Sequence, residues 1–178
     1  SIVFPRNQFN ENYSNICRAL NINYLRTNPT NFLYRTRDKT AENHWLLRGL
    51  RLMDTYINIA GKQLGVPRAD NGVVHIPASR MFRPFQPKLK ALEPFKLGRI
   101  KKEMTAAAQQ NKLYHLWWHP HNFGTNTSEN LTQLTEILTH FQRLKKDYGF
   151  QSQNMQEIGA AYSKNKVIKT PRQILVGA

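Results

Sequence analysis

The sequence has only one cysteine, Cys17, among its 178 residues. A single cysteine excludes an internal disulfide framework and any zinc site built from paired cysteines. Cys17 occupies an apolar position of an expected helix, so we interpret it as a buried small side chain rather than a reactive thiol. Stability must therefore come from an apolar core, for which a chain of this length with 40% hydrophobic residues is large enough.

Long apolar runs and phosphate-binding loops are also absent from the sequence. No run approaches eighteen apolar residues, so we expect no membrane span. The first residues lack the pattern of a signal peptide, and a cytoplasmic location is favoured although the compartment stays unknown. Neither G-x-G-x-x-G nor G-x-x-x-x-G-K occurs, which leaves nucleotide-phosphate binding without support.

Acidic residues are scarce: 11 stand against 26 lysines and arginines, for a formal net charge of +15. Such an excess favours anionic partners, including nucleic acid, acidic polysaccharide or a membrane surface. An ordinary solvated basic surface accounts for the same charge equally well. Charge alone therefore selects no mechanism.

Short apolar runs alternate with helical patterns along the whole chain. Strands are expected at residues 1–4, 22–25, 73–76, 113–118 and, more weakly, 150–153. Helices are expected at residues 12–20, 40–60, 94–111, 126–148 and 155–163. This alternation indicates βα units around a parallel sheet, an α/β fold class.

Apolar spacing predicts which side of each longer helix is buried. In 40–60 that side comprises Leu46, Leu50, Met53, Ile57 and Ala60, with Gly61 as the expected stop. In 94–111 it comprises Phe95, Ile100, Met104 and Ala107. Asn126 and Glu129 have the spacing of a capping box before the helix that ends at Gly149.

Polar and aromatic residues gather after each of the first four expected strands. The loops read "PRNQ", "RTNPTNFLYRTR", "PASRMFRP" and "HPHNFG", whereas the returns from helix to strand are short. Parallel α/β folds place their functional sites at the carboxyl ends of the strands. We therefore expect a site at that end of the sheet.

The stretch "LYHLWWHPHNFG", residues 113–124, is the densest of these segments. Period two places His115, Trp117 and His119 on one side of a strand, which Pro120 should end. His119 is then a candidate general acid or base at the strand's carboxyl end. Two other interpretations stay open: metal ligation by the three histidines of the segment, including His121, and a purely structural role.

Other candidates carry weaker signals. Arg6 also follows an expected strand, where it would be either an ion-pair partner or a group that orients a carboxylate. Trp117 and Trp118 could stack on sugar rings, although core packing is the favoured interpretation of tryptophans in a strand. His75, within an apolar strand, is interpreted as a core histidine.

Taken together, "VFPRNQF", "VVHIPASRMFRPF", "LYHLWWHPHNFG" and "MQEIG" resemble the carboxyl-terminal part of the polysaccharide deacetylase (NodB-homology) family, over residues 1 to about 162. The resemblance implies part of a distorted (β/α)7 barrel and metal-dependent hydrolysis of acetyl groups on bacterial carbohydrate. It implies that His119 is the general acid, that Leu116 lines the acetyl pocket, and that Arg6 holds a catalytic aspartate. It carries no role for Trp117 or Trp118, which stay candidate substrate contacts.

The sequence departs from that family in one respect. The family's early motifs supply the aspartate base and the metal ligands, and no Asp-Asp pair occurs here. His115 and His119 have the ligand spacing, but they lie in the late motif, so no metal ligand is assigned to this chain. The resemblance thus implies that a divalent metal, zinc by preference, comes from a missing amino-terminal half.

We therefore expect residues 1–163 to be the carboxyl-terminal part of a deacetylase barrel and residues 164–178 a basic tail. The expected function is a share in a carbohydrate deacetylase that is inactive without its amino-terminal half. A half-barrel would expose strand edges, so we expect that half or self-association as partner, besides the carbohydrate. The alternative is a non-catalytic basic module that binds nucleic acid or another polyanion; no recognisable nucleic-acid motif supports it.

Overall fold

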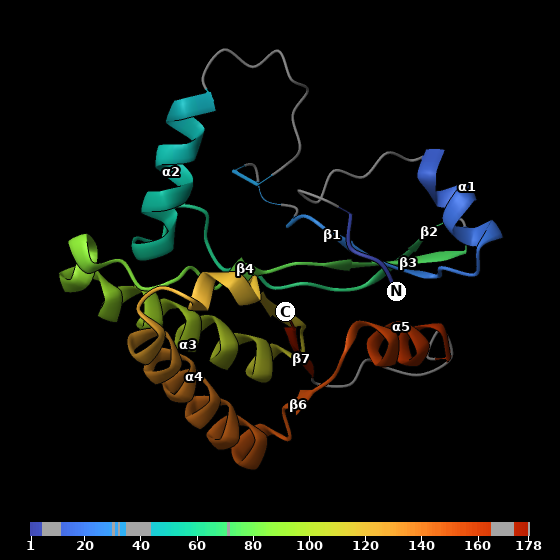
Figure 1. The fold of residues 1–178 in the computed structure, drawn as a ribbon. Helices are drawn as coiled ribbons and strands as arrows, with labels where there is room; N and C mark the ends of the chain where they lie inside the picture. The colour runs from blue at the N-terminus through green and yellow to red at the C-terminus, as the bar shows by residue number, and fades with distance from the viewer. Residues whose placement is uncertain are drawn as a thin grey trace.

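The computed structural model describes residues 1–4, 12–29, 31, 33–34, 44–70, 72–164 and 173–177. These residues form a mixed α/β fold (Figure 1). In chain order the elements are α1 (Asn12–Ala19), β1 (Tyr24–Thr27), α2 (His44–Tyr56), β2 (Arg68–Asp70), β3 (Val73–Pro77), β4 (Arg80–Met81), η2 (Pro87–Leu92), α3 (Glu93–Gln110), β5 (Tyr114–Trp117), η3 (Pro120–Phe123), α4 (Thr127–Tyr148), β6 (Gln151–Ser152), α5 (Met155–Lys164) and β7 (Gln173–Gly177).

The described strands pair mainly in parallel, as the alternation of runs predicts. β1 pairs with β3, β4 with β5, and β7 with both β5 and β6, all in parallel. β2 runs antiparallel to β3. Backbone bonds from Ala78 N to Thr27 O (2.8 Å) and from Ser79 N to His115 O (2.9 Å) connect the two groups of strands. No barrel closes among the strands described.

The carboxyl-terminal segment differs from the expected tail. Residues 173–177 form β7, which lies between β5 and β6 in the order β4-β5-β7-β6. A basic run precedes this short strand and gives the whole segment the composition of a tail. Five residues suffice for β7 to pair along the whole of β5.

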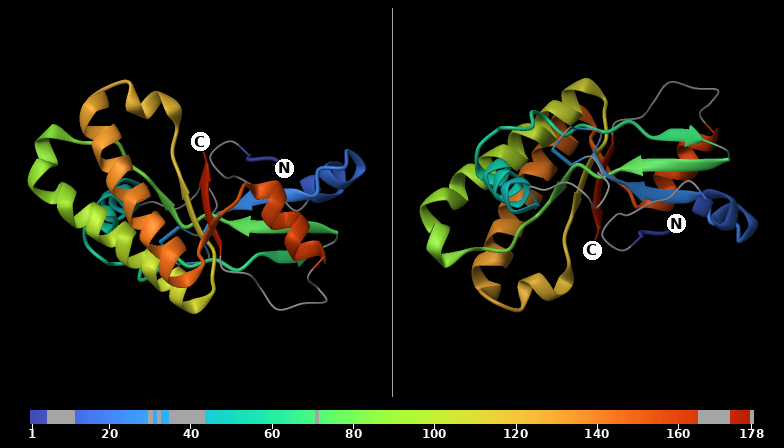
Figure 2. Two further views of the ribbon diagram at one scale, coloured as in Figure 1. Left: turned by 90° about the horizontal axis from the view of Figure 1, so that it is seen from below. Right: turned by 90° about the horizontal axis from the view of Figure 1, so that it is seen from above.

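Helices cover the strands in two places (Figure 2). α3 and α4 lie side by side and enclose the largest core cluster, whose fully buried members include Phe82, Ile100, Met104, Leu116 and Ile137. α5 packs against β1 and β3 through a second cluster of Val74, Ile76, Leu113 and Ile158. Among the described residues no helix has both the length and the hydropathy to cross a bilayer.

Three expectations about the helices are wrong. Most of the stripe predicted for α2 faces outward: Leu46, Met53 and Ile57 are 45%, 50% and 57% exposed, whereas Ala60 is buried as predicted. Phe95, expected in the core, is 63% exposed. Asn126 has φ 54° and makes no side-chain cap bond, because a capping residue needs an extended backbone. The helix start expected at residues 40–43 lies outside the described residues.

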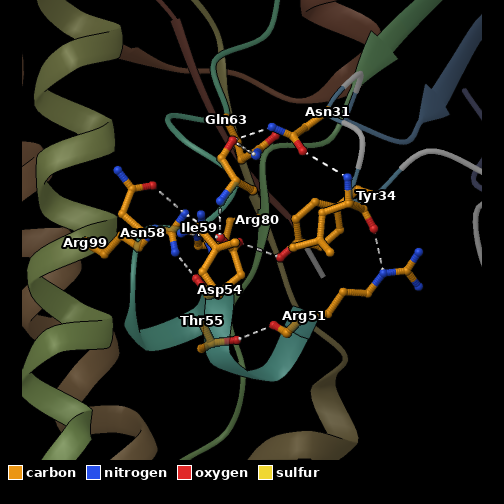
Figure 3. Close-up of polar contacts among 12 residues, drawn as sticks. Asn31, Tyr34, Arg51, Asp54, Thr55, Asn58, Ile59, Gln63, Arg80 and Arg99 are labelled. Atoms are coloured by element: carbon orange, nitrogen blue, oxygen red, sulfur yellow. Dashed lines mark hydrogen bonds and ion pairs between the residues drawn. The ribbon is translucent and has the colours of Figure 1, made fainter. Parts of the chain in front are cut away.

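A buried ion network explains why the apolar stripe of α2 faces outward (Figure 3). Asp54, fully buried on α2, forms ion pairs with Arg80 of β4 (3.4 Å) and Arg99 of α3 (3.0 Å). Arg80 also binds Glu103 of α3 through two bonds of 2.9 and 2.8 Å. The side of α2 that carries Asp54 must therefore face the protein, and the apolar stripe lies on the other side.

Hydrogen bonds complete this network. Tyr34 and Tyr114 donate their hydroxyls to Asp54 (2.8 Å) and Glu103 (3.0 Å). Asp54 Oδ1 also accepts the backbone N–H groups of Ile59 (3.1 Å) and Ala60 (2.7 Å). Burial, followed by the charge of Glu103, raises the pKa of the Tyr114 hydroxyl well above its ordinary value. Both tyrosines therefore act as neutral donors.

Candidate functional site at the carboxyl ends of the strands

The carboxyl ends of β1 and β5 bring an arginine and a tryptophan together. The Arg26 guanidinium lies over the Trp117 ring, 4.3 Å from its centroid, in a cation–π contact. Arg26 is only 8% exposed, and burial lowers its pKa to about 10. A pKa of that value keeps the guanidinium charged at neutral pH, so the site carries a fixed positive charge beneath an aromatic ring.

His119 lies on the open side of this pair. Its ring meets the Trp117 ring edge-on, with centroids 5.4 Å apart at 82°. The His119 and His121 rings stack at 5.1 Å and 12°, and both side chains are exposed. The 3-10 turn η3 holds the two histidines together, since Asn122 N donates to His119 O (2.9 Å) and Gly124 N to His121 O (3.2 Å).

His115 lies deeper on the same side of β5. It is buried, and the structure gives its Nδ1 no hydrogen-bond partner among the described residues. Burial, and then the charge of Arg26, lowers its pKa to about 3. His115 is therefore neutral near pH 7 and supplies no proton there.

Strand alternation separates the other predicted site residues from this group. Leu116 is fully buried in the cluster under α3 and α4. Trp118 packs edge-on against Phe82 at 6.3 Å and lies near Phe123 at 6.0 Å. Leu116 thus lies in the core on the helix side of β5 and the partly buried Trp118 packs against that core, because even-numbered positions face opposite to Trp117. Of the predicted contacts, only Trp117 reaches His119.

Arg6, predicted to orient a carboxylate, lies outside the described residues. Among the residues described, no group of three His, Cys, Asp or Glu side chains gathers in a way that could hold a metal. Within the described residues, the stacked pair of His119 and His121 is thus not part of such a group.

Arg26 is the functional candidate that the sequence analysis missed. The expected strand at 22–25 ended two residues too early, because β1 extends to Thr27 and includes Arg26. Because side chains alternate along a strand, Arg26 lies on the same face of β1 as Tyr24, two residues earlier. The polar loop that begins at Arg26 was the available signal.

A cleft of about 640 Å³ opens beside the ends of β1 and β3. Its lining includes Thr27, His75, Lys62, Arg68 and Asp70. His75 is half-buried and not a core residue as expected, and burial lowers its pKa. Because Thr27 and His75 alternate with Arg26 and Ile76, the cleft lies on the face of the strands opposite to Trp117.

Comparisons of the chain with protein-family models, curated proteins and solved structures return no match. The geometry alone thus defines a partly open aromatic site with one buried cation and two exposed imidazoles. An aromatic face next to polar groups suits a sugar ring, and an exposed imidazole suits proton transfer.

Proposed function

We propose that this chain is the carboxyl-terminal part of a metal-dependent carbohydrate deacetylase, within a distorted (β/α)7 barrel. The observation that carries the proposal is the placement of exposed His119 against Trp117 at the carboxyl ends of parallel strands. The resemblance of the segment that contains these residues to the family's late motif also supports the proposal. The reaction is hydrolysis of an N- or O-acetyl group on a polysaccharide or a sugar precursor.

In this proposal His119 is the general acid. The departing amine or alcohol needs a proton as the bond to the acetyl carbon breaks, and imidazole is suited to supply one. The exposed position of His119 beyond the end of β5 leaves its ring accessible to a substrate. His115 cannot take this part, since its pKa of about 3 leaves no proton to donate near pH 7.

Trp117 and Arg26 form the floor of the site. The half-buried Trp117 offers its remaining surface to a sugar ring, while Arg26 fixes its orientation from the other side. The Arg26 charge also favours negative charge that develops near it in the reaction. The metal ligands and the catalytic base are assigned to the family's early motifs, which this chain does not contain, and no step is assigned to a metal here.

Substrates with different leaving groups test the role of His119. The chain is combined with an amino-terminal half that carries the early motifs, and acetate release is measured from an N-acetylated oligosaccharide and from 4-nitrophenyl acetate. His119→Ala should lower the rate on the sugar by about 10²–10⁴-fold. The loss on the aryl ester should be much smaller, because 4-nitrophenolate leaves without a proton.

His121→Ala is the matched control, since its ring is equally exposed and stacks on His119. It should change both rates by less than about tenfold, as expected of a group outside proton transfer. Equal losses on both substrates for His119→Ala would contradict the general-acid role. Acetate release by this chain alone would contradict the assignment of the metal and base to another half.

A further inference from the structure

Helix α2 presents an apolar surface that nothing in the described structure covers. Its outward side carries the exposed residues Trp45, Leu46, Leu52, Met53 and Ile57, and Trp45 is 75% exposed. The opposite side holds the buried ion network, so α2 cannot rotate to bury the stripe without breaking it. Figure 1 shows α2 standing at the edge of the molecule.

The start of α3 lies against the end of α2 and carries a further exposed apolar side chain. Tyr56 at the end of α2 donates its hydroxyl to Glu93 (3.3 Å), and Arg99 donates to Ile57 O (2.6 Å). Phe95 lies one turn before Arg99 on α3 and is 63% exposed. We call the exposed residues Trp45, Leu46, Leu52, Met53, Ile57 and Phe95 the α2 face.

The exposed charges of the two described segments that carry the α2 face, residues 44–62 and 83–100, have one sign. In residues 44–62 the only acid is Asp54, which is fully buried and paired. In residues 83–100 the only acid is Glu93, which is 4% exposed and paired with Lys96. The exposed charges of both segments are cationic: Arg48, Lys62, Lys88 and Lys90.

We propose that the α2 face binds an anionic lipid surface. An apolar helix side with an exposed tryptophan, on two segments whose exposed charges are all lysine or arginine, matches the interfacial region of a bilayer with anionic headgroups. A second copy of the chain fits less well, because pairing two α2 faces would oppose the cationic residues of these two described segments, among which no acid is exposed. The net charge of +15 acts in the same direction.

Co-flotation with vesicles tests the proposal on the full chain. One set of vesicles contains phosphatidylcholine alone and the other adds phosphatidylglycerol. The chain should bind the anionic set, and binding should weaken as salt is added. Leu52→Ser/Met53→Ser should lower the partition coefficient at least about tenfold, because two large apolar side chains are lost from the bilayer.

The matched control is Leu131→Ser/Leu138→Ser, which removes two comparably exposed apolar side chains from α4. It should leave binding unchanged, and circular dichroism should show both variants folded. Absent binding, binding equal on neutral vesicles, or equal loss in the α4 variant would each overturn the proposal. So would sedimentation equilibrium that shows a dimer which the α2 substitutions dissociate, since a second copy would then cover the face.

Discussion

Replacing Asp54 with asparagine removes one of two negative charges from the buried network. The network balances Arg80 and Arg99 against Asp54 and Glu103, so its formal charge is +2 − 2 = 0 in the native protein. Asp54→Asn leaves a net +1 that water does not reach, since Arg80 is 5% and Arg99 7% exposed. The substitution changes almost no volume, so the effect isolates the charge.

The expected cost is about 3–5 kcal/mol in the free energy of unfolding, the range for breaking a buried pair at one partner. The upper part of that range applies because Asp54 also accepts from Tyr34 and from the N–H groups of Ile59 and Ala60. An asparagine keeps one acceptor oxygen for these donors and turns an amide toward an arginine. The loss would be a large share of the stability of a domain this size.

Urea unfolding followed by circular dichroism measures this cost. Asp147→Asn on the exposed side of α4 is the control and should change stability by less than about 0.5 kcal/mol. The double variant Asp54→Asn/Arg99→Met restores charge balance and should lose clearly less than the sum of its single variants. A cost below about 1 kcal/mol for Asp54→Asn would refute the claim that the network depends on this charge.

Four further substitutions test other parts of the fold. Burial lowers the pKa of His115 to about 3 in the folded chain, so the contribution of His115 to stability is full above its ordinary pKa near 6.5 and falls as the pH drops. His115→Gln should therefore remove about 2 kcal/mol of the stability that the native protein loses between pH 6.5 and 5, as measured by urea titrations. An unchanged dependence of the unfolding free energy on pH would contradict this expectation. Gly159→Ala should destabilise the fold by about 1–3 kcal/mol, because the added Cβ would overlap the Tyr24 ring. In Gly98→Ala the added Cβ meets open space, so this substitution should stabilise the fold by about 0.5–1 kcal/mol. A change in unfolding free energy of the same sign for both variants would contradict the packing around Gly159. Ser79→Ala removes the hydroxyl that accepts from His115 N (3.0 Å), and its thermal unfolding should show a cost of about 1–3 kcal/mol, a neutral result being inconsistent with that bond.

The parallel strands could be predicted from sequence because their apolar runs are buried from both sides. "VVHI" lies within β3 and "LYHLWW" spans β5. Period two also brought Trp117 and His119 together, which the ring contact confirms. The same alternation turns Leu116 and Trp118 to the helix side of β5, where Leu116 is buried and Trp118 is partly buried. The position of a residue in a motif therefore did not show which side of the strand its side chain faces.

The orientation of α2 could not be predicted, because periodicity shows that a stripe exists and not which way it faces. Long-range partners decide it: Asp54 binds Arg80 and Arg99, which lie 26 and 45 residues away. Arg26 was missed for a related reason. Its position over Trp117 depends on the register of β1 against β3 and not on local composition.

The place of β7 in the sheet has a consequence for synthesis. β5 and β6 are translated well before residues 173–177, yet they have no partner between them until β7 exists. During that interval the β5 edge presents unpaired backbone groups that favour association with other chains. Pairing between such distant segments is also slow, because a long loop must close first. Folding of the nascent chain should therefore finish in the middle of the sheet, and a fluorophore near residue 177 would report that last event.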